Sequence, residues 1–183
     1  MRITGGSFGG RNLLVPNSGE IRPTQDRVRE ALFSILQTVV PGAKVLDLFA
    51  GTGAFGLEAL SRGAAAVELV ERNPRHAEII RRNLALVRAE ARVTVADAYR
   101  YVETYAGDGF DLVFADPPYA LGAEKGYAHV LEMLKARGTV RPGGLFVAEM
   151  TAVQHAEETP GWELLRDRIY GKTRICIWRN QNA

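Results

Sequence analysis

The sequence predicts an α/β protein with a doubly wound, mainly parallel sheet of seven strands whose last strand is antiparallel, preceded by a short β-hairpin and a helix. Apolar runs of strand length alternate along the chain with segments whose apolar residues recur at helical spacing. The last two runs instead flank Gly171 directly, as the strands of a β-hairpin do. The final strand is therefore expected to run antiparallel to its neighbour.

Composition describes an ordinary globular protein. The 183 residues suffice for one domain with a substantial core, and 46% of them are hydrophobic and 24% charged. The single cysteine, Cys176, excludes an intramolecular disulfide, and no cysteine or histidine cluster has the spacing of a zinc site. Because there is no signal-like apolar run and no membrane-length apolar stretch, we expect a cytoplasmic protein. We also expect a monomer without a bound metal.

Residues 1–23 are polar, glycine-rich and basic, and we expect them to form an arm ahead of the main domain, residues 24–183. The segments 2–4 and 11–15 have strand character around a glycine-rich turn, which predicts a hairpin. The arginines indicate a flexible arm for a phosphate backbone, although the composition is equally typical of a solvated leader.

A helix is predicted next, with Thr24 as its N-cap and Asp26 in its first turn. Pro41 and Gly42 end the helical pattern. Arg27 and Arg29 fall on the face opposite the apolar stripe, where they could face a ligand or water. The stripe itself is expected to be buried and consists of Val28, Leu32, Ile35, Leu36 and Val39.

The stretch from Val45 to Gly56 predicts a strand, a tight turn and the start of a helix. Gly51 and Gly53 let the backbone turn sharply and approach a ligand closely. Taken alone, the glycine spacing also matches the dinucleotide-binding fingerprint. Asp47 discriminates between ligands, because a carboxylate at this turn repels a pyrophosphate but attracts a cation. S-adenosylmethionine, which carries a sulfonium and an ammonium group, fits this turn better than NAD.

Acidic residues stand at the ends of four successive predicted strands: Asp47, Glu71, Asp97 and Asp116. Ligands of doubly wound sheets bind beyond the carboxyl ends of the strands, so the repeated placement predicts one ligand site. Glu71 lies 20 residues beyond Gly51, where a carboxylate accepts the hydroxyls of a ribose. Asp97 is expected to accept from an adenine amino group, to cap the helix that begins at Ala98, or to do both.

The remaining elements follow the same alternation. A helix after Asn73 and Pro74 has a buried stripe and an arginine-rich exposed face, for which RNA contact and simple solvation both stay open. A helix is predicted over residues 127–137, and a Pro142-Gly143-Gly144 turn precedes the strand 145–150. The other predicted strands are 66–71, 92–97, 110–115, 162–170 and 172–179.

Asp116-Pro117-Pro118-Tyr119 directly follows a predicted buried strand. Two consecutive prolines fix the backbone and remove two N–H donors, so the bend presents acceptors only: the Asp116 carboxylate and the Pro117 carbonyl. Two acceptors can hold both hydrogens of an exocyclic amine and aim its lone pair outward. Tyr119 offers an aromatic face for a flipped base, worth about 1–3 kcal/mol. This pattern predicts amine methylation by positioning and electrostatics.

Over nearly its whole length the chain resembles the class I S-adenosylmethionine-dependent methyltransferases, which have a Rossmann-like fold. It is similar in particular to the bacterial RsmD family, the 16S rRNA guanine-N2 methyltransferases. The segments that carry this resemblance are Arg2-Ile3-Thr4-Gly5-Gly6, Gly10-Arg11, Arg22-Pro23-Thr24, the run from Asp26 to Phe33, the glycine turn 48–53 and the run from Gly56 to Gly63.

The resemblance implies an S-adenosylmethionine cofactor and methylation of one guanine in 16S rRNA, in an assembled or assembling small ribosomal subunit. It implies catalytic roles for Asp116, Pro117 and Tyr119. The residues expected to hold the cofactor are Asp47, Phe49, Gly51, Gly53, Glu71, Arg72, Asp97, Ala98 and Asp116. The residues expected to contact RNA are Arg11, Arg22, Pro23, Thr24 and Tyr119.

Three alternatives stay open. The same chemistry could act on adenine N6 in nucleic acid or on a protein glutamine, although Asp rather than Asn at position 116 argues mildly against glutamine. A NAD-dependent oxidoreductase would explain the glycine spacing but not Asp116 to Tyr119. A catalytically silent RNA-binding module would leave Asp116 and Tyr119 without a role.

Overall fold

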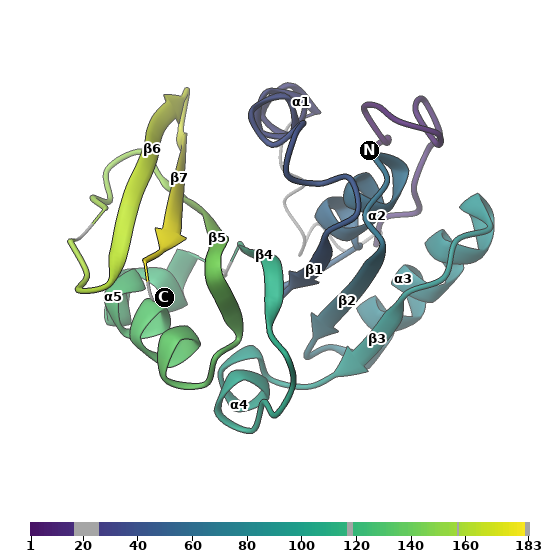
Figure 1. The fold of residues 1–183 in the computed structure, drawn as a ribbon. Helices are drawn as coiled ribbons and strands as arrows, with labels where there is room; N and C mark the ends of the chain where they lie inside the picture. The colour runs from purple at the N-terminus through teal and green to yellow at the C-terminus, as the bar shows by residue number, and fades with distance from the viewer. Residues whose placement is uncertain (17–25, 117–118, 157, 182–183) are drawn as a thin grey trace. The chain divides into compact units, whose positions relative to one another are not determined.

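The computed structural model describes residues 1–16, 26–116, 119–156 and 158–181. The chain divides into two compact units, Met1–Ala98 and Tyr99–Ala183, and each is described by itself. Figure 1 labels the helices and strands of both units and colours the chain from purple at the N-terminus to yellow at the C-terminus. Among the described helices, none is long and apolar enough to span a bilayer.

The first unit is built on three parallel strands in the order β3-β2-β1. One helix connects β1 to β2 and another connects β2 to β3, so each of these two crossovers joins parallel neighbours. Strands β1 and β2 are buried beyond their first residues, and Val45, Leu46 and Leu69 are fully shielded from solvent, whereas Val95 at the end of β3 is exposed. The strands are β1 (Lys44–Asp47), β2 (Ala66–Glu71) and β3 (Arg92–Val95), and the helices of this part are α1 (Asp26–Ile35), α2 (Ala54–Ser61) and α3 (Pro74–Val87).

Local sequence explains the two helices that follow β1 and β2. Helix α3 begins with Asn73, whose side chain accepts a hydrogen bond from the Arg75 amide, and with Pro74 at its first position. Helix α2 packs tightly on the sheet because Gly56 has no side chain. A Cβ there would lie 2.7 Å from a methyl carbon of Leu69.

The second unit contains four strands in the order β4-β5-β7-β6. Strands β4 and β5 are parallel, and β7 pairs antiparallel with both β5 and β6. Four aromatic side chains on these strands and on α5 pack against one another: Tyr127, Phe146, Trp162 and Trp178. The elements are α4 (Ala98–Glu103), β4 (Phe110–Ala115), α5 (Tyr119–Ala136), β5 (Val140–Thr151), β6 (Trp162–Tyr170) and β7 (Thr173–Asn180).

The predicted α/β class, the seven strands, the mainly parallel pairing and the antiparallel last strand are confirmed. Helix α5 begins at Tyr119, eight residues before the predicted start, because glycines at positions 122 and 126 lower the helical signal in the sequence there. Strand β5 begins at Val140 and includes the predicted turn, where the register with β4 shifts between Phe110 and Leu112. A register shift of this kind accommodates glycine and proline within a strand.

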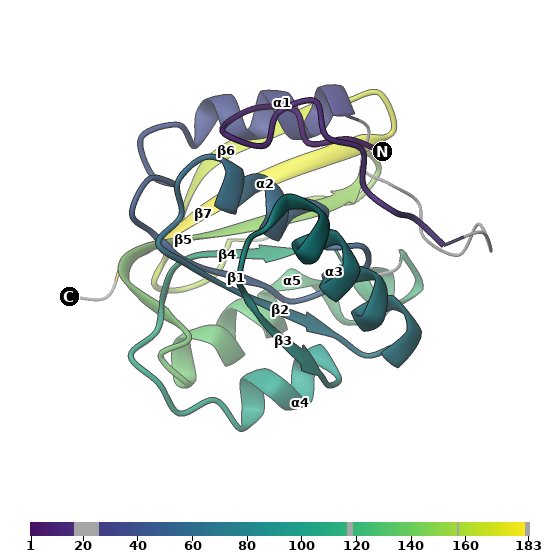
Figure 2. The same cartoon turned by 90° about the vertical axis from the view of Figure 1, so that its right-hand side faces the viewer.

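The N-terminal segment, residues 1–16, is docked on the first unit rather than free in solvent. One antiparallel bridge joins Arg2 to Asn12, and the turn between them contacts α2 through the Ser61 hydroxyl and carbonyl. Ile3 and Leu13 are buried. Figure 2 shows this segment, in purple, alongside α1, consistent with the ion pair between Arg2 and Asp26. The expected hairpin is present, but it is held in place.

The prediction of an exposed face for Arg29 is wrong. Arg29 has no solvent-exposed surface, and its guanidinium contacts Glu58 at 3.4 Å and Asp26 at 2.9 Å. Arg27 is exposed as expected, and Ile35 of the predicted buried stripe is 38% exposed. The helical periodicity alone did not reveal Arg29 as buried, because its partner Glu58 lies 29 residues away on α2.

Candidate active site

The glycine turn after β1 has the backbone geometry that its sequence requires. Gly51 and Gly53 have φ values of 55° and 83°, in the left-handed region where a side chain is strained. Gly53 is the N-cap of α2, and its amide bonds the Ala50 carbonyl at 2.6 Å. The turn is therefore a tight, glycine-dependent connection between the carboxyl end of β1 and the helix.

Asp47 lies beneath this turn, at the end of β1, and only 1% of its surface is exposed. One carboxylate oxygen, Oδ2, accepts the Gly56 amide of the first turn of α2 at 3.3 Å. The other, Oδ1, is buried and has no hydrogen-bond partner among the described residues. A buried acceptor without a partner is costly, and it indicates a donor or a cation that the described part of the chain does not supply.

Burial raises the pKa of Asp47 from its ordinary 3.8 to about 7. The Gly56 amide lowers this pKa, the nearby Glu71 carboxylate raises it, and the Phe49 amide lowers it again. A cation placed beside Asp47 would favour the ionised form and lower the pKa. Asp47 is thus poised to change its protonation state near neutral pH when a cation arrives.

Glu71, at the end of β2, joins the glycine turn to the start of α3. Its Oε2 accepts the Gly51 amide at 2.9 Å, and its Oε1 accepts the Asn73 amide at 2.7 Å. The ring of His76 lies 3.8 Å from Oε1. A carboxylate offers about four acceptor positions, so two remain after these two bonds. Two neighbouring hydroxyl groups, such as those of a ribose, match this remaining capacity.

The other predicted cofactor residues of the first unit are less buried. Phe49 follows β1 and is half-buried, Arg72 follows Glu71 and is exposed, and Asp97 is exposed directly before α4. Ala98 is buried as the first residue of α4. The structure therefore brings Asp47, the glycine turn and Glu71 into one bonded cluster, and it places Asp97 and Arg72 at the ends of the neighbouring strands.

Asp116 belongs to the second unit, where it directly follows β4 and is half-buried. Its charge acts on the buried Tyr127 of α5, whose hydroxyl donates to the Glu149 carbonyl at 2.8 Å. The pKa of Tyr127 is raised well above its usual value, first by burial and then by Asp116. The predicted residues Pro117, Arg22, Pro23 and Thr24 lie outside the described residues, as does the side chain of Tyr119.

Two buried polar residues near the glycine turn were missed by the sequence interpretation. Asn83 of α3 holds the Leu14 backbone by two hydrogen bonds and also donates to the Thr52 carbonyl of the glycine turn. Glu58 of α2 accepts from the Thr4 amide and hydroxyl and pairs with Arg29 and Arg62.

Both of these residues carried a signal in the sequence. Asn83 interrupts the apolar stripe of its helix, and Glu58 is the one charged residue of α2. A polar side chain on a buried helical face needs partners, and these partners turn out to be the N-terminal segment and the glycine turn.

Arg11, expected to contact RNA, is exposed, and its guanidinium donates to the Leu86 carbonyl at 3.3 Å. Leu86 lies in the last turn of α3, where the helix carbonyls lack intrahelical partners. Arg11 is thereby held at the end of α3 with most of its surface open to solvent.

Comparison with known proteins agrees with the arrangement of this cluster. The family described as conserved hypothetical protein 95 matches residues 1–179. Ribosomal RNA small subunit methyltransferase D of Escherichia coli K12 is 36% identical over 99% of this chain and 90% of its own length. The protein of the same name from Haemophilus influenzae is 30% identical over 98% of this chain and 94% of its own length.

The fold is shared as well. The solved structure of the Escherichia coli protein yhhF covers 100% of this chain and 99% of its own, with 32% identity and a TM-score of 0.88. Similarity thus extends over both units and over the strand ends that carry Asp47, Glu71 and Asp116. The chain belongs to the conserved hypothetical protein 95 family, the family that it shares with these ribosomal RNA small subunit methyltransferases D.

Proposed function

We propose that this protein transfers a methyl group from S-adenosylmethionine to the exocyclic N2 of one guanine in the 16S rRNA of the small ribosomal subunit. Membership of the methyltransferase D family supports the reaction and the rRNA substrate. The observation that supports S-adenosylmethionine as the cofactor is the environment of Asp47. This carboxylate is buried beneath a glycine turn, and one of its oxygens has no hydrogen-bond partner among the described residues.

The cluster favours S-adenosylmethionine over a dinucleotide. In dinucleotide-binding folds the helix after the glycine turn offers its N-terminal amides to a pyrophosphate. Here an amide of that first turn, Gly56, bonds Asp47 instead, and the carboxylate would repel an added anion. The residues therefore fit a cationic ligand.

When bound, S-adenosylmethionine supplies a methyl group on a sulfonium, an electrophile for a nitrogen lone pair. In this proposal Asp47 faces the positive part of the cofactor, Glu71 accepts the ribose hydroxyls through its two remaining positions, and Asp97 accepts from the adenine amino group. Phe49, Arg72 and Ala98 surround the same ligand. Burial of Asp47 strengthens its attraction to the cation, because fewer water molecules screen the charge.

Asp116 and the Pro117 carbonyl hold the two hydrogens of the guanine amine and aim its lone pair at the methyl carbon. Methyl transfer to this nitrogen would leave the electron pair of the C–S bond on the sulfur of the cofactor, and one proton of the amine would pass to the Asp116 carboxylate that holds it. Asp116 stabilises the positive charge that develops on that nitrogen. Tyr119 stacks on the flipped base.

The folded small subunit, rather than naked RNA, is the proposed substrate. In this proposal the enzyme works in the cytoplasm as a monomer, and Arg11, Arg22, Pro23 and Thr24 contact the RNA near the target.

Labelled methyl transfer tests the function. Small subunits, free 16S RNA, tRNA and DNA are each incubated with labelled S-adenosylmethionine, and the labelled product is digested to nucleosides. We expect N2-methylguanosine from small subunits. Label in adenine or in protein would move the enzyme to another amine substrate, and absence of label from every substrate would contradict the function.

A further inference from the structure

Positive charge without a partner is concentrated on the exposed side of α3. Six arginines and two glutamates occur between residues 72 and 92, a local excess of four positive charges, whereas the whole chain carries only +2. Arg75, Arg82 and Arg88 are exposed and form no ion pair with any described residue. The rest of the chain therefore has a small negative net charge, whereas this segment has a positive one.

Exposed arginines elsewhere are divided between paired and unpaired ones. Arg2 pairs with Asp26 at 3.3 Å, Arg141 with Asp111 at 2.8 Å and Arg179 with Glu163 at 2.5 Å, whereas Arg166 and Arg168 of β6 have no acidic partner among the described residues. A solvated face that served only for solubility would be expected to carry mixed charges. The local excess of positive charge on α3 therefore indicates that this helix presents its arginines to a negatively charged partner.

Geometry aligns the arginines in a row. Arg75 and Arg82 are seven residues apart, so they lie on one side of α3 about 10 Å apart along its axis. Leu86, whose carbonyl holds Arg11, follows Arg82 by one further turn. Arg88, the left-handed C-cap, ends the helix at the same place. These four side chains, Arg11, Arg75, Arg82 and Arg88, are called the arginine face.

Helix α3, which carries the arginine face, is held firmly to the rest of the first unit. Asn73 caps the start of α3, and Asn83 holds the helix to both the Leu14 backbone and the Thr52 carbonyl. Asn83 has no exposed surface. Because α3 starts directly after Glu71 and Asn73, the arginine face begins beside the candidate cofactor cluster and extends away from it.

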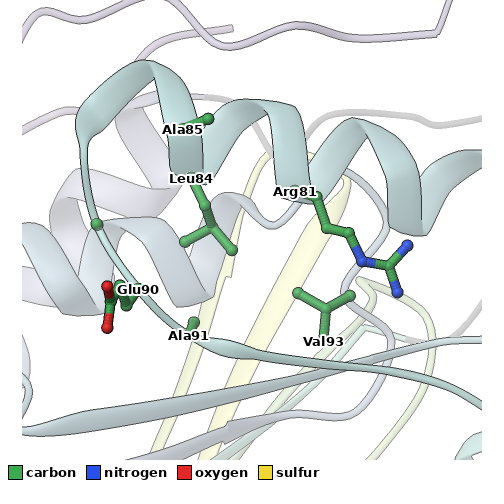
Figure 3. A pocket seen from close by; sticks show the side chains of 7 residues that line it. Arg81, Leu84, Ala85, Glu90, Ala91 and Val93 are labelled. Atoms are coloured by element: carbon green, nitrogen blue, oxygen red, sulfur yellow. The ribbon is translucent and has the colours of Figure 1, made fainter.

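An open hollow adjoins the C-terminal half of α3, between this helix and β3 (Figure 3). Arg81, which pairs with Glu78 at 3.6 Å, lies along it, and the rest of its lining combines the Glu90 carboxylate with apolar side chains, among them Leu84, Ala85 and Val93. Nucleic acid strands combine phosphates with apolar sugar and base surfaces, so apolar surface next to the arginines of α3 suits such a strand. Arginine also binds phosphate in a two-pronged geometry that lysine lacks.

We propose that the arginine face binds the phosphate backbone of the rRNA at a distance from the target base, as a docking surface that orients the small subunit. This inference rests on the proposed function for the identity of the RNA. Phosphate contacts of this kind fix register and orientation without reading sequence. They contribute affinity that falls as salt rises.

The test compares two matched double variants. Arg75→Ala/Arg82→Ala removes two arginines of the face, and alanine preserves the helix. Arg166→Ala/Arg168→Ala removes two exposed arginines of β6, whose hydrogen bonds within the described part of the chain go to carbonyls of their own strand. The two variants lose the same charge, so a difference between them reports the position of the lost charge and not its amount.

Binding to small subunits is measured by cosedimentation across a salt series, and KM and kcat are measured for methyl transfer. For the α3 variant we expect about tenfold weaker binding, a salt slope smaller by about two, a raised KM and a kcat within about twofold of wild type. The β6 variant should match the wild type in slope and KM. Equal behaviour of the two variants would overturn the proposal.

Binding to protein-free 16S RNA separates RNA from a ribosomal protein as the partner. Weaker binding of the α3 variant to this RNA supports the proposal. Unchanged RNA binding with weaker subunit binding would assign the face to a protein and overturn it. Cosedimentation needs no methyl transfer, so a failure of the proposed reaction stays distinguishable from a failure of the docking surface.

Discussion

The two units of the molecule use buried polar groups differently. In Met1–Ala98, five charged side chains are buried: Arg29, Asp47, Glu58, Glu68 and Glu71. Among the described side chains of Tyr99–Ala183, the buried charged residues are Glu149 and Arg174, and the interior is dominated by the aromatic group around Phe146 and Trp178. Buried charge costs free energy unless it is paired or bonded, so its concentration in one unit indicates where function constrains the core.

This difference indicates what each unit contributes to the candidate active site. The first unit has polar side chains that hold loops and leave capacity for a ligand, as Asp47 and Glu71 do. The second unit packs large rings around its sheet and holds Asp116 at the end of a buried strand. Paired substitutions in the two units test this contrast.

Removal of Glu58 should have the largest effect on stability. Glu58→Ala leaves the fully buried Arg29 guanidinium without this partner, and we expect a loss of about 3–5 kcal/mol in the free energy of unfolding. The matched control is Glu163→Ala in the second unit, whose pair with Arg179 is exposed and worth about 0–1 kcal/mol. Urea denaturation measures both, and equal losses would contradict the contrast.

The Asp47→Asn variant should change both the pH dependence of stability and the affinity for the cofactor, and the two effects can be measured separately. The raised pKa of Asp47 means that the folded protein, free of cofactor, holds a proton that the unfolded chain releases near pH 4. Its contribution to stability is complete below pH 4 and is lost as pH rises to about 7, by up to about 1.4 kcal/mol per pH unit.

Asparagine has no such titration, so the variant should lack this part of the pH dependence and be more stable than the wild type at pH 8. Its affinity for S-adenosylmethionine should fall about tenfold or more, because a charged partner of the cation is lost. Thermal melts at pH 5 and 8 and calorimetric titration with the cofactor check both parts. Unchanged cofactor affinity would remove Asp47 from the proposed site.

Asp116→Ala should leave cofactor affinity intact and lower kcat by about 100-fold to 1000-fold, the usual cost of losing one preorganised group that stabilises transition-state charge. Asp111→Ala is the control on the same strand, since Asp111 pairs with Arg141 at 2.8 Å. Single-turnover methyl transfer with saturating cofactor measures the step. A wild-type rate from the Asp116 variant would refute its catalytic role.

Two buried asparagines, one in each unit, are expected to give the smallest effects and allow the most direct comparison of the units. Asn83 of the first unit and Asn180 of the second each donate from one amide group to two backbone carbonyls. Alanine at either position should cost about 1–3 kcal/mol of stability. Only Asn83→Ala should also weaken cofactor binding, because only Asn83 holds the glycine turn. Equal cofactor affinity in both variants would mean that the turn holds its shape without Asn83.

Much of the fold could be predicted from the sequence, because periodicity and turn residues are local properties. The bounds of β2, β4 and β6 were predicted to the residue, and the buried stripe of α3 is correct. The start of α5 was missed, since glycines at positions 122 and 126 lower the helical signal there. Local pattern therefore sufficed wherever one face of an element was uniformly apolar.

The strand ends at Asp47 and Glu71 and the strand directly before Asp116 could be predicted from the sequence, because they follow from local apolar runs. The predicted strand 92–97 was too long, since β3 ends at Val95 and Asp97 lies two residues beyond it. The sequence by itself also determined the glycine turn, since Gly51 and Gly53 occupy left-handed backbone that other residues avoid. These features depend on residues that are close together in the chain.

Only the tertiary structure decided which polar groups are buried and what they hold. Glu58 meets Thr4 across 54 positions, Asn83 meets Leu14 across 69, and Asp47 keeps an oxygen without a partner. Such pairings depend on how elements distant in sequence pack, and burial then sets their strength by excluding water. For that reason the pKa of Asp47, the docking of the N-terminal segment and the unpaired arginines of α3 became visible only in the folded protein.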